Sequence, residues 1–302
     1  MKILYYECFA GISGDMHLAA LLGLGVDEEW LRAELARLPI AEPWEFRVRP
    51  GQKSGIAGLS VEVLENPPAR GHEHAHPHRH LGEMEDLIRA AAFSPRVTER
   101  SLTALRALAA AEAEVHGMDI QAVTLHEVSG LDTIIDLVGA ALCLEYLAAE
   151  EIWSSPVELG GGFVSCAHGV LPVPAPAVQN LLRGVPVTLG RVTAETTTPT
   201  GAAVVKTFVG RFPSRPAFVP RRTAYGLGSR DLSVPNALRV TLADAAPVGA
   251  PDAEAFYEHA AQYVIETNID DMSGEVLAYA EELLLRAGAL DVWRLPCQMK
   301  KG

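Results

Sequence analysis

The sequence lacks a hydrophobic run long enough to cross a membrane. Its longest apolar stretch, 137–149, contains Glu145 and covers 13 residues, whereas a transmembrane helix needs about 20. Glu7 lies where a signal peptide would need its apolar region. We therefore expect a cytoplasmic protein that has no membrane-spanning segment, and we interpret 137–149 as a buried helix.

Cysteine and positive charge are also scarce. Four scattered cysteines form no CxxC pair, which favours a reduced, cytosolic environment. Lys and Arg total 25 against 38 Asp and Glu, giving a formal net charge of −13. This balance disfavours a phosphate-backbone partner such as nucleic acid. It favours cations, or anionic substrates where local donors overcome the negative field.

Histidine, by contrast, is concentrated in one place. Five of the ten histidines fall within 72–80, at His72, His74, His76, His78 and His80. Neutral imidazole is a good ligand for nickel, zinc and copper, so a His-rich tract predicts metal binding. The alternative is a solvated polar loop, because the preceding residues 66–71 supply no apolar side chains with which to fold.

The patterning predicts an α/β (α+β) protein with a mixed-sheet N-terminal domain and packed helices. Buried strands are expected at 2–8, 45–49 and 56–64, and helices after Gly11–Gly14, from Asp27, from the Ser94-Pro95 pair to Gly117, and over 129–148. We expect an N-terminal domain over 1–244 that contains the His-rich loop 71–80, followed by a Pro/Ala/Gly-rich linker at 245–255. The segment 256–302 has strand, helix and strand patterns at 263–270, 273–287 and 289–296, which predict an incomplete ferredoxin-like βαβ unit.

The richest chemical segment is LHEVSGLDTIID, 125–136. Asp132 and Asp136 are four residues apart and share one helix face, and His126 and Glu127 arrive just before the helix. One imidazole and three carboxylates suit a divalent cation or a proton-transfer site. The structural alternative is a capping box in which Ser129 and Asp132 satisfy the first amides of the helix.

Glycine-marked turns supply candidate anion sites, because a helix N-terminus presents unpaired amides to phosphate or carboxylate. One turn is 11–15, which ends in Asp15. A second, TTTPTG at 196–201, predicts Thr198 as N-cap and leaves Thr200 and the amide of Gly201 to hold an anion. A third, YGLG at 225–228, is accompanied by Asn236 and Arg239. His168 precedes a proline-rich run that would stiffen a loop. Each is equally compatible with an ordinary cap, turn or solvated side chain.

Taken together and in order, these segments resemble the LarC family of nickel-insertion proteins. The resemblance covers nearly the whole chain and rests on FAGISGDM, the His-rich loop, AEAEVHG, LHEVSGLDTIIDLVGAA, HGVLPVPAPA, TTTPTGAA, YGLGSRDLSVPNALR and ETNIDDMSGE. It implies a nickel chelatase of the lyase class. Such an enzyme inserts Ni(II) into pyridinium-3,5-bisthiocarboxylic acid mononucleotide, forms metal–sulfur and metal–carbon bonds, and consumes CTP together with Mg or Mn. The nickel-pincer cofactor that results serves lactate racemase-type enzymes.

The resemblance also guides the expected assembly. Family members normally continue beyond the final MKKG into the rest of a C-terminal domain associated with CTP, so we expect this chain to be an N-terminal portion that is inactive alone if truncated. The expected partners are nickel, the pyridinium mononucleotide, a lactate racemase-type apoenzyme and further copies of the chain in a homo-oligomer, with neither nucleic acid nor membrane.

The combined hypothesis assigns a role to each candidate residue. The residues predicted to act in catalysis are Asp136, Glu127 and Asp15. Those predicted to bind the nucleotide are Thr198, Thr200, Gly201, Asn236 and Arg239. Those predicted to bind metal are His72, His74, His76, His78, His80, His126, Asp132 and His168. Two other classes remain open: a non-catalytic nickel store or metallochaperone, and a phosphate-ester hydrolase that uses the acidic cluster with Mg or Mn.

Overall fold

The computed structural model describes residues 1–65, 80–123, 130–166, 169–246 and 263–298. The chain divides into two compact units, 1–248 and 249–302. Within the residues described, no helix is long and apolar enough to cross a membrane.

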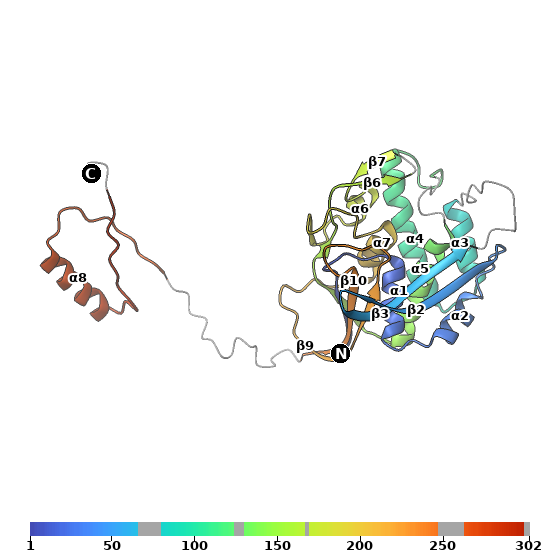
Figure 1. Cartoon of the computed structure of the whole chain (residues 1–302), viewed down its shortest axis with the longest axis horizontal. Helices are drawn as coiled ribbons and strands as arrows, with labels where there is room; N and C mark the ends of the chain where they lie inside the picture. The colour runs from blue at the N-terminus through green and yellow to red at the C-terminus, as the bar shows by residue number, and fades with distance from the viewer. Residues whose placement is uncertain (66–79, 124–129, 167–168, 247–262, 299–302) are drawn as a thin grey trace. The chain divides into compact units, whose positions relative to one another are not determined.

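The first unit is built around a six-stranded mixed sheet with strand order β2-β3-β9-β10-β1-β4 (Figure 1). Its strands are β1 (Lys2–Glu7), β2 (Trp44–Lys53), β3 (Ile56–Glu65), β4 (Glu151–Ser154), β9 (Phe218–Leu227) and β10 (Ala237–Ala245); two small sheets pair β5 (Val157–Glu158) with β8 (Val187–Thr188) and β6 (Phe163–Cys166) with β7 (Gly169–Pro172). Its helices are α1 (Gly14–Gly23), α2 (Glu28–Leu35), α3 (Leu81–Ala90), α4 (Pro95–His116), α5 (Leu131–Leu147), α6 (Pro176–Leu181) and α7 (Pro199–Phe208). The predicted α/β class with a mixed sheet is confirmed.

Strand β1 shows how the sheet separates its two faces. Alternate side chains of a strand point to opposite faces. Leu4 and Tyr6 therefore enter the main core, whereas Ile3 and Tyr5 join a smaller buried cluster with Trp153 on the other face. Because both faces are covered, the strand is apolar along most of its length.

Helix α1 lies directly on the sheet, against β3, β9 and β10. Gly226 in β9 permits this approach, since a Cβ at that position would lie 1.7 Å from the carbonyl oxygen of Met16. The segment 225–227, which we interpreted as part of an anion-binding turn, is therefore the end of a strand. The expected turn at 225–227 is therefore wrong, and Gly226 serves helix–sheet packing, whereas Leu227 and Gly228 line the cavity described below.

Helix α5 packs between α1 and α4 and is buried along nearly its whole length, which explains why 137–149 is so apolar. The predicted start of α4 is confirmed: the Ser94 hydroxyl accepts the amide of Val97 at 3.2 Å, and Pro95 is the first helical residue. Gly117 ends the helix in the left-handed conformation, as expected.

In the second unit the structure confirms the helix but not the strands. Helix α8 (Gly274–Arg286) begins after Ser273, whose side chain accepts the amide of Val276. The predicted strands at 263–270 and 289–296 form no β-structure in the described segment 263–298. A strand is stabilised by pairing with another strand, and the apolar side chains of this segment are largely exposed. Apolar pattern alone was therefore a poor guide here.

Candidate functional site

Three helices of the first unit direct their N-terminal ends at one cavity of about 780 Å³. Its lining includes Ser13 to Asp15 at the start of α1, Asp132 and Thr133 at the start of α5, and Thr198 to Thr200 at the start of α7. Each helix N-terminus carries a partial positive charge and unpaired amides. The fold thus brings together three turns that are far apart in the sequence.

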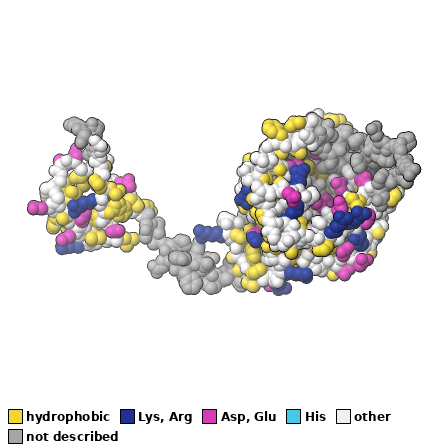
Figure 2. All heavy atoms as spheres, viewed as in Figure 1, with side chains coloured by type: hydrophobic (Ala, Val, Ile, Leu, Met, Phe, Trp, Pro, Cys, Tyr) yellow, Lys and Arg dark blue, Asp and Glu magenta, His cyan; other side chains and the backbone are white. Residues whose placement is uncertain are grey.

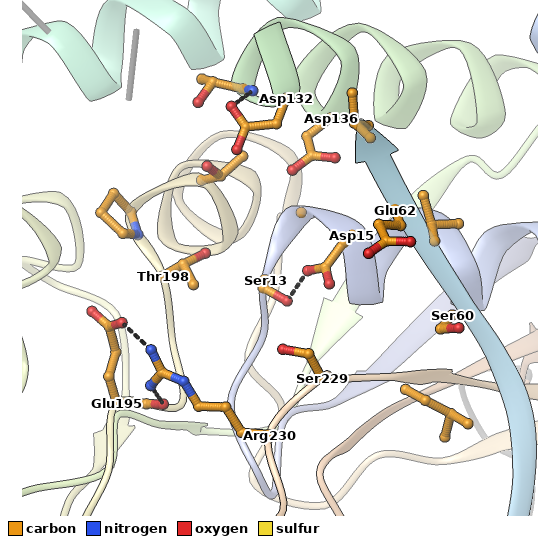
Figure 3. A pocket seen from close by; sticks show the side chains of 18 of the residues that line it. Ser13, Asp15, Ser60, Glu62, Asp132, Asp136, Glu195, Thr198, Ser229 and Arg230 are labelled. Atoms are coloured by element: carbon orange, nitrogen blue, oxygen red, sulfur yellow. Dashed lines mark hydrogen bonds and ion pairs between the residues drawn. The ribbon is translucent and has the colours of Figure 1, made fainter. Parts of the chain in front are cut away.

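One end of the cavity is acidic. Figure 3 shows Asp132 and Asp136 entering from α5, with Asp15 of α1 directed into the same space. The one-turn spacing of Asp132 and Asp136 predicted that they would share a face, and both line the cavity. Asp132 also accepts the amide of Thr133 at 2.7 Å, so it satisfies one of the first amides of the helix, whose N-cap is Gly130.

Asp136 is the least satisfied member of this group. Its side chain is only 8% exposed, and its Oδ1 atom has no hydrogen-bond partner in the described structure. Burial raises the pKa of the Asp136 carboxyl well above its ordinary value, and the charges of Asp15 and Asp132 raise it further. A buried carboxyl without a partner is costly to the fold, which marks Asp136 as a candidate for ligand binding or proton transfer.

Gly14 leaves room for this carboxyl. A Cβ at position 14 would lie 2.0 Å from Oδ2 of Asp136, so a larger residue cannot occupy the first position of α1 without moving the acid. Beside it, the Ser13 hydroxyl donates a hydrogen bond to Asp15. Burial raises the pKa of Asp15, whereas its hydrogen bonds with Ser13 and with the Met16 backbone oppose this rise. The α1 turn therefore supports the acidic end of the cavity.

A second wall of the cavity, formed by the β2–β3 hairpin, carries three cations together with Glu62. Arg47, Arg49 and Lys53 are separated by even numbers of residues, so they share one face of β2. Arg47 is held tightly by Glu45 at 2.6 Å, but Arg49 lies 3.9 Å from Glu62. Figure 2 shows basic and acidic side chains side by side on one face of this unit.

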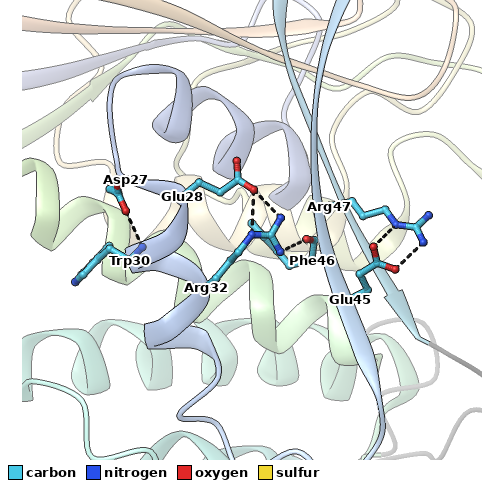
Figure 4. A network of polar contacts seen from close by, with 7 residues as sticks. All are labelled: Asp27, Glu28, Trp30, Arg32, Glu45, Phe46 and Arg47. Carbon is cyan, nitrogen blue, oxygen red and sulfur yellow. Dashed lines mark hydrogen bonds and ion pairs between the residues drawn. The ribbon is translucent and has the colours of Figure 1, made fainter.

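The hairpin wall is attached to the rest of the unit through α2 (Figure 4). Arg32 of that helix donates to the backbone carbonyl of Phe46 and to Glu28 at 2.6 Å. Asp27 caps the same helix by accepting the amide of Trp30 at 2.7 Å, as the sequence predicted. This network fixes β2, and with it the backbone that presents the cationic side chains.

Arg230 adds a fourth cation from the loop after β9 (Figure 3). Its guanidinium donates to the backbone carbonyl of Glu195 at 3.0 Å and lies 3.6 Å from that residue's carboxylate. The Arg230 carbonyl accepts hydrogen bonds from Lys53 at 3.2 Å and from Asn236 at 3.0 Å. The predicted nucleotide ligand Asn236 is thus 7% exposed, does not line the cavity, and holds the loop that carries Arg230.

The α7 turn agrees only partly with its predicted role. Thr198 is the N-cap and Thr200 lines the cavity, as expected. However, the amide of Gly201 already donates to the Thr198 hydroxyl at 3.2 Å. A Cβ at Gly201 would also lie 2.0 Å from the carbonyl oxygen of Ile12. The expectation that this amide is free for an anion was therefore wrong, and the glycine allows α7 to approach the α1 turn.

Arg239 does not join the other predicted nucleotide ligands. It pairs across the β1–β10 ladder with Glu7, to which it donates two hydrogen bonds. Both residues line a separate cavity of about 410 Å³, together with Arg191. The predicted grouping of Arg239 with Thr198 and Thr200 was wrong, because strand register gives this guanidinium a carboxylate partner elsewhere.

Several predicted ligands lie outside the described residues: His72, His74, His76, His78, His126, Glu127 and His168. His80 is described; it is exposed and precedes α3, where its backbone amide donates to Glu83 at 2.9 Å. The described part of the chain contains no group of three or more His, Cys, Asp or Glu side chains arranged to hold a metal ion. The metal-binding assignments therefore remain predictions.

Sequence reasoning missed the cationic side of the cavity. Arg49 ends the predicted strand 45–49, Lys53 lies four residues beyond it, and Arg230 comes two residues after the YGLG segment. The even spacing on β2 was an available signal for a shared face. Nothing local indicated that this face would meet the loop at Arg230, since β3 and β9 join through a parallel pairing at Leu59 and Gly226.

Comparison with known proteins identifies the family. The family model described as "Nickel insertion protein" matches residues 4–302. Two relatives carry the name "Pyridinium-3,5-bisthiocarboxylic acid mononucleotide nickel insertion protein". The one from Clostridium kluyveri is 45% identical over all of this chain and 75% of its own length. The one from Clostridium acetobutylicum is 43% identical over all of this chain and 76% of its own length. A third of that name, from Akkermansia muciniphila, is 44% identical over all of this chain and 73% of its own length. No solved structure matches. The chain belongs to the nickel insertion protein family.

Proposed function

We propose that this chain inserts Ni(II) into pyridinium-3,5-bisthiocarboxylic acid mononucleotide within the 780 Å³ cavity. The names of its relatives support the substrate. The observation that carries the assignment to this cavity is the buried Oδ1 of Asp136 at its acidic end, which has no hydrogen-bond partner among the described residues. Nickel and the mononucleotide are both substrates in this scheme, and CTP is a third.

The reaction needs a group that accepts a proton. Forming a nickel–carbon bond on the pyridinium ring replaces a ring C–H bond, and the proton must leave while nickel stays in the +2 state. A carboxylate with a raised pKa accepts a proton more readily near neutral pH than an ordinary one. A divalent cation placed beside Asp136 favours its ionised form. We assign Asp136 as the proton acceptor, and Asp15 and Asp132 as the side chains that attract the cation.

The test is mass-spectrometric detection of the nickelated mononucleotide. Ni(II), CTP and the precursor are supplied to a C-terminally extended chain in three forms: the wild type, Asp136→Asn, and the matched surface control Asp86→Asn, whose side chain is 81% exposed on α3. We expect product from the wild type and the control, and at least a 100-fold loss in Asp136→Asn, since general bases contribute about 10²–10⁴-fold. An equally active Asp136→Asn protein would refute the assignment of the base.

Omitting CTP separates this function from nickel storage. A chelatase should form product only with CTP and the precursor, whereas a storage protein or metallochaperone should load nickel stoichiometrically without either. Comparing this chain with a C-terminally extended one shows which residues CTP use requires. We also propose a cytoplasmic homo-oligomer of the lyase class whose product serves a lactate racemase-type apoenzyme.

A further inference from the structure

Charged side chains are distributed unevenly around the cavity. The basic residues that line it, Arg47, Arg49, Lys53 and Arg230, have no role in the proposed proton transfer. Asp15, Asp132 and Asp136 lie toward one end, whereas Arg230 lies on the opposite side with Glu195 (Figure 3). A ligand that matches this arrangement carries a cation, or binds one, at one end and carries an anion at the other.

The cations differ in how firmly they are held. Lys53 makes three contacts with the 229–231 loop, the shortest at 2.5 Å to Asp231, and Arg47 makes two 2.6 Å hydrogen bonds with Glu45. The nearest carboxylates to Arg49 and Arg230 lie at 3.9 and 3.6 Å. Arg49 and Glu62 form an exposed ion pair, a kind of pair that contributes little to stability, so redirecting Arg49 toward a ligand costs little. Arg230 already donates to the Glu195 carbonyl at 3.0 Å, and the Glu195 carboxylate beside it is only 12% exposed.

Arg230 is also positioned by groups that do not touch its guanidinium. Lys53 and Asn236 both donate to its backbone carbonyl, at 3.2 and 3.0 Å. The loop is therefore fixed while the guanidinium remains half exposed at the cavity. The α7 turn also lines the cavity through Thr198 and Thr200. Arginine is suited to gripping phosphate through two parallel hydrogen bonds.

We propose that Arg230 and Arg49 bind the phosphate monoester of the pyridinium mononucleotide, so that phosphate fixes which end of the substrate meets the carboxylates. This inference rests on the proposed function for the identity of the substrate. Lys53 is a positioning residue, because it acts through the backbone of the Arg230 loop. The site selects a nucleotide over the corresponding nucleoside.

The experiment compares two probes in isothermal titration calorimetry: pyridinium-3-carboxylate mononucleotide and its dephosphorylated riboside. The wild type should bind the mononucleotide at least tenfold more tightly. Arg230→Gln and Arg49→Gln should each reduce that preference by about tenfold, because a hydrogen bond to a charged group contributes about 1.5–3 kcal/mol. Arg183→Gln is the matched control: Arg183 is exposed, pairs with Glu114 at 2.7 Å and does not line the cavity.

Further measurements distinguish the source of the phosphate. Higher ionic strength should weaken binding of the mononucleotide and leave binding of the riboside unchanged. Arg230→Gln could instead weaken only the binding of CTP and leave the preference for the mononucleotide over the riboside intact. That result would overturn the proposal in favour of a triphosphate site. Equal binding of both probes by the wild type, or no detectable binding of the mononucleotide, also overturns it. Lys53→Met should reduce the preference, and Lys53→Arg should restore it.

The turnover assay separates this inference from the proposed function. Arg230→Gln should raise KM for the precursor while kcat is largely retained, since phosphate binding is the same in the ground and transition states. A wild type that forms nickelated product without any phosphate preference refutes this inference alone. A wild type that prefers the phosphorylated probe and forms no nickelated product refutes the proposed function alone.

Discussion

Replacing Asp136 by Asn is expected to stabilise the fold while it abolishes nickel insertion. Burial, together with Asp15 and Asp132, places the pKa of Asp136 above its ordinary value in the folded protein. The folded state therefore binds a proton more tightly than the unfolded state does. This stabilising contribution is complete below the unfolded pKa of about 3.9, and it is lost as pH rises through the folded pKa.

The limiting slope of this loss is about 1.4 kcal/mol per pH unit for one carboxyl. Asn has nearly the same shape and cannot ionise, so the free energy of unfolding of the Asp136→Asn protein does not fall with pH through this group. An unpartnered buried acceptor costs about 1–3 kcal/mol, and more when charged. Asn keeps this buried oxygen but removes the cost of charging it, which exceeds the cost of burying a neutral acceptor. We therefore expect the variant to gain roughly 1–3 kcal/mol in free energy of unfolding at pH 9, and much less at pH 5.

Urea denaturation followed by far-UV circular dichroism at several pH values measures this gain. Asp86→Asn, the same chemical change at an exposed site, should show no comparable pH-dependent gain. A stability difference between Asp136→Asn and the wild type that stays constant with pH would contradict the argument. So would a wild type that remains the more stable protein at pH 9.

Three further predictions concern packing, capping and the His tract. Gly201→Ala should destabilise the fold by about 1–3 kcal/mol through overpacking, since its Cβ would lie 2.0 Å from the carbonyl oxygen of Ile12. Thermal denaturation measures this loss, and Gly210→Ala, whose Cβ would have its nearest contact at 3.9 Å, is the control. Ser94→Ala should cost about 1 kcal/mol by removing the α4 cap, whereas Ser101→Ala in the same helix should be neutral or stabilising, because the buried Ser101 hydroxyl has no partner among the described residues. Deleting 72–80 should lower the number of nickel ions bound in equilibrium dialysis and leave binding of the mononucleotide unchanged; loss of nucleotide binding would contradict separate roles for the tract and the cavity.

The acidic end of the cavity could be predicted from sequence because its determinants are local. Asp132 and Asp136 are one helical turn apart, and Gly14 and Asp15 follow a strand at the start of a helix. Helix periodicity and capping preferences operate over a few residues, so they are visible without tertiary information. The same reasoning correctly placed the caps at Ser94 and Thr198.

The basic side depends on contacts between distant segments. Lys53 donates a hydrogen bond to the Arg230 carbonyl, 177 residues away in sequence, and Arg239 donates to the Glu7 carboxylate, 232 residues away. Both contacts follow from strand order and register, which a single local pattern does not contain. Arg239 lies away from Thr198 and Thr200 for this reason: the residue type suits phosphate, but the β1–β10 pairing places Glu7 beside its guanidinium.

Helix capping alone does not explain the acidic end. Asp15 and Asp132 lie in the first turns of α1 and α5, where a carboxylate interacts favourably with the helix dipole, so a structural role accounts for part of their presence. Asp136 lies beyond the first turn of α5 and is buried, and no described residue forms a hydrogen bond with its Oδ1. It also requires glycine at position 14, where a Cβ would meet its carboxyl at 2.0 Å. We expect a neutral side chain at 136 to give a more stable protein, so the presence of an acid there supports the proposed interaction with nickel or with the proton that nickel displaces. If Asp136→Asn were both less stable and fully active, this reasoning would fail at its first step.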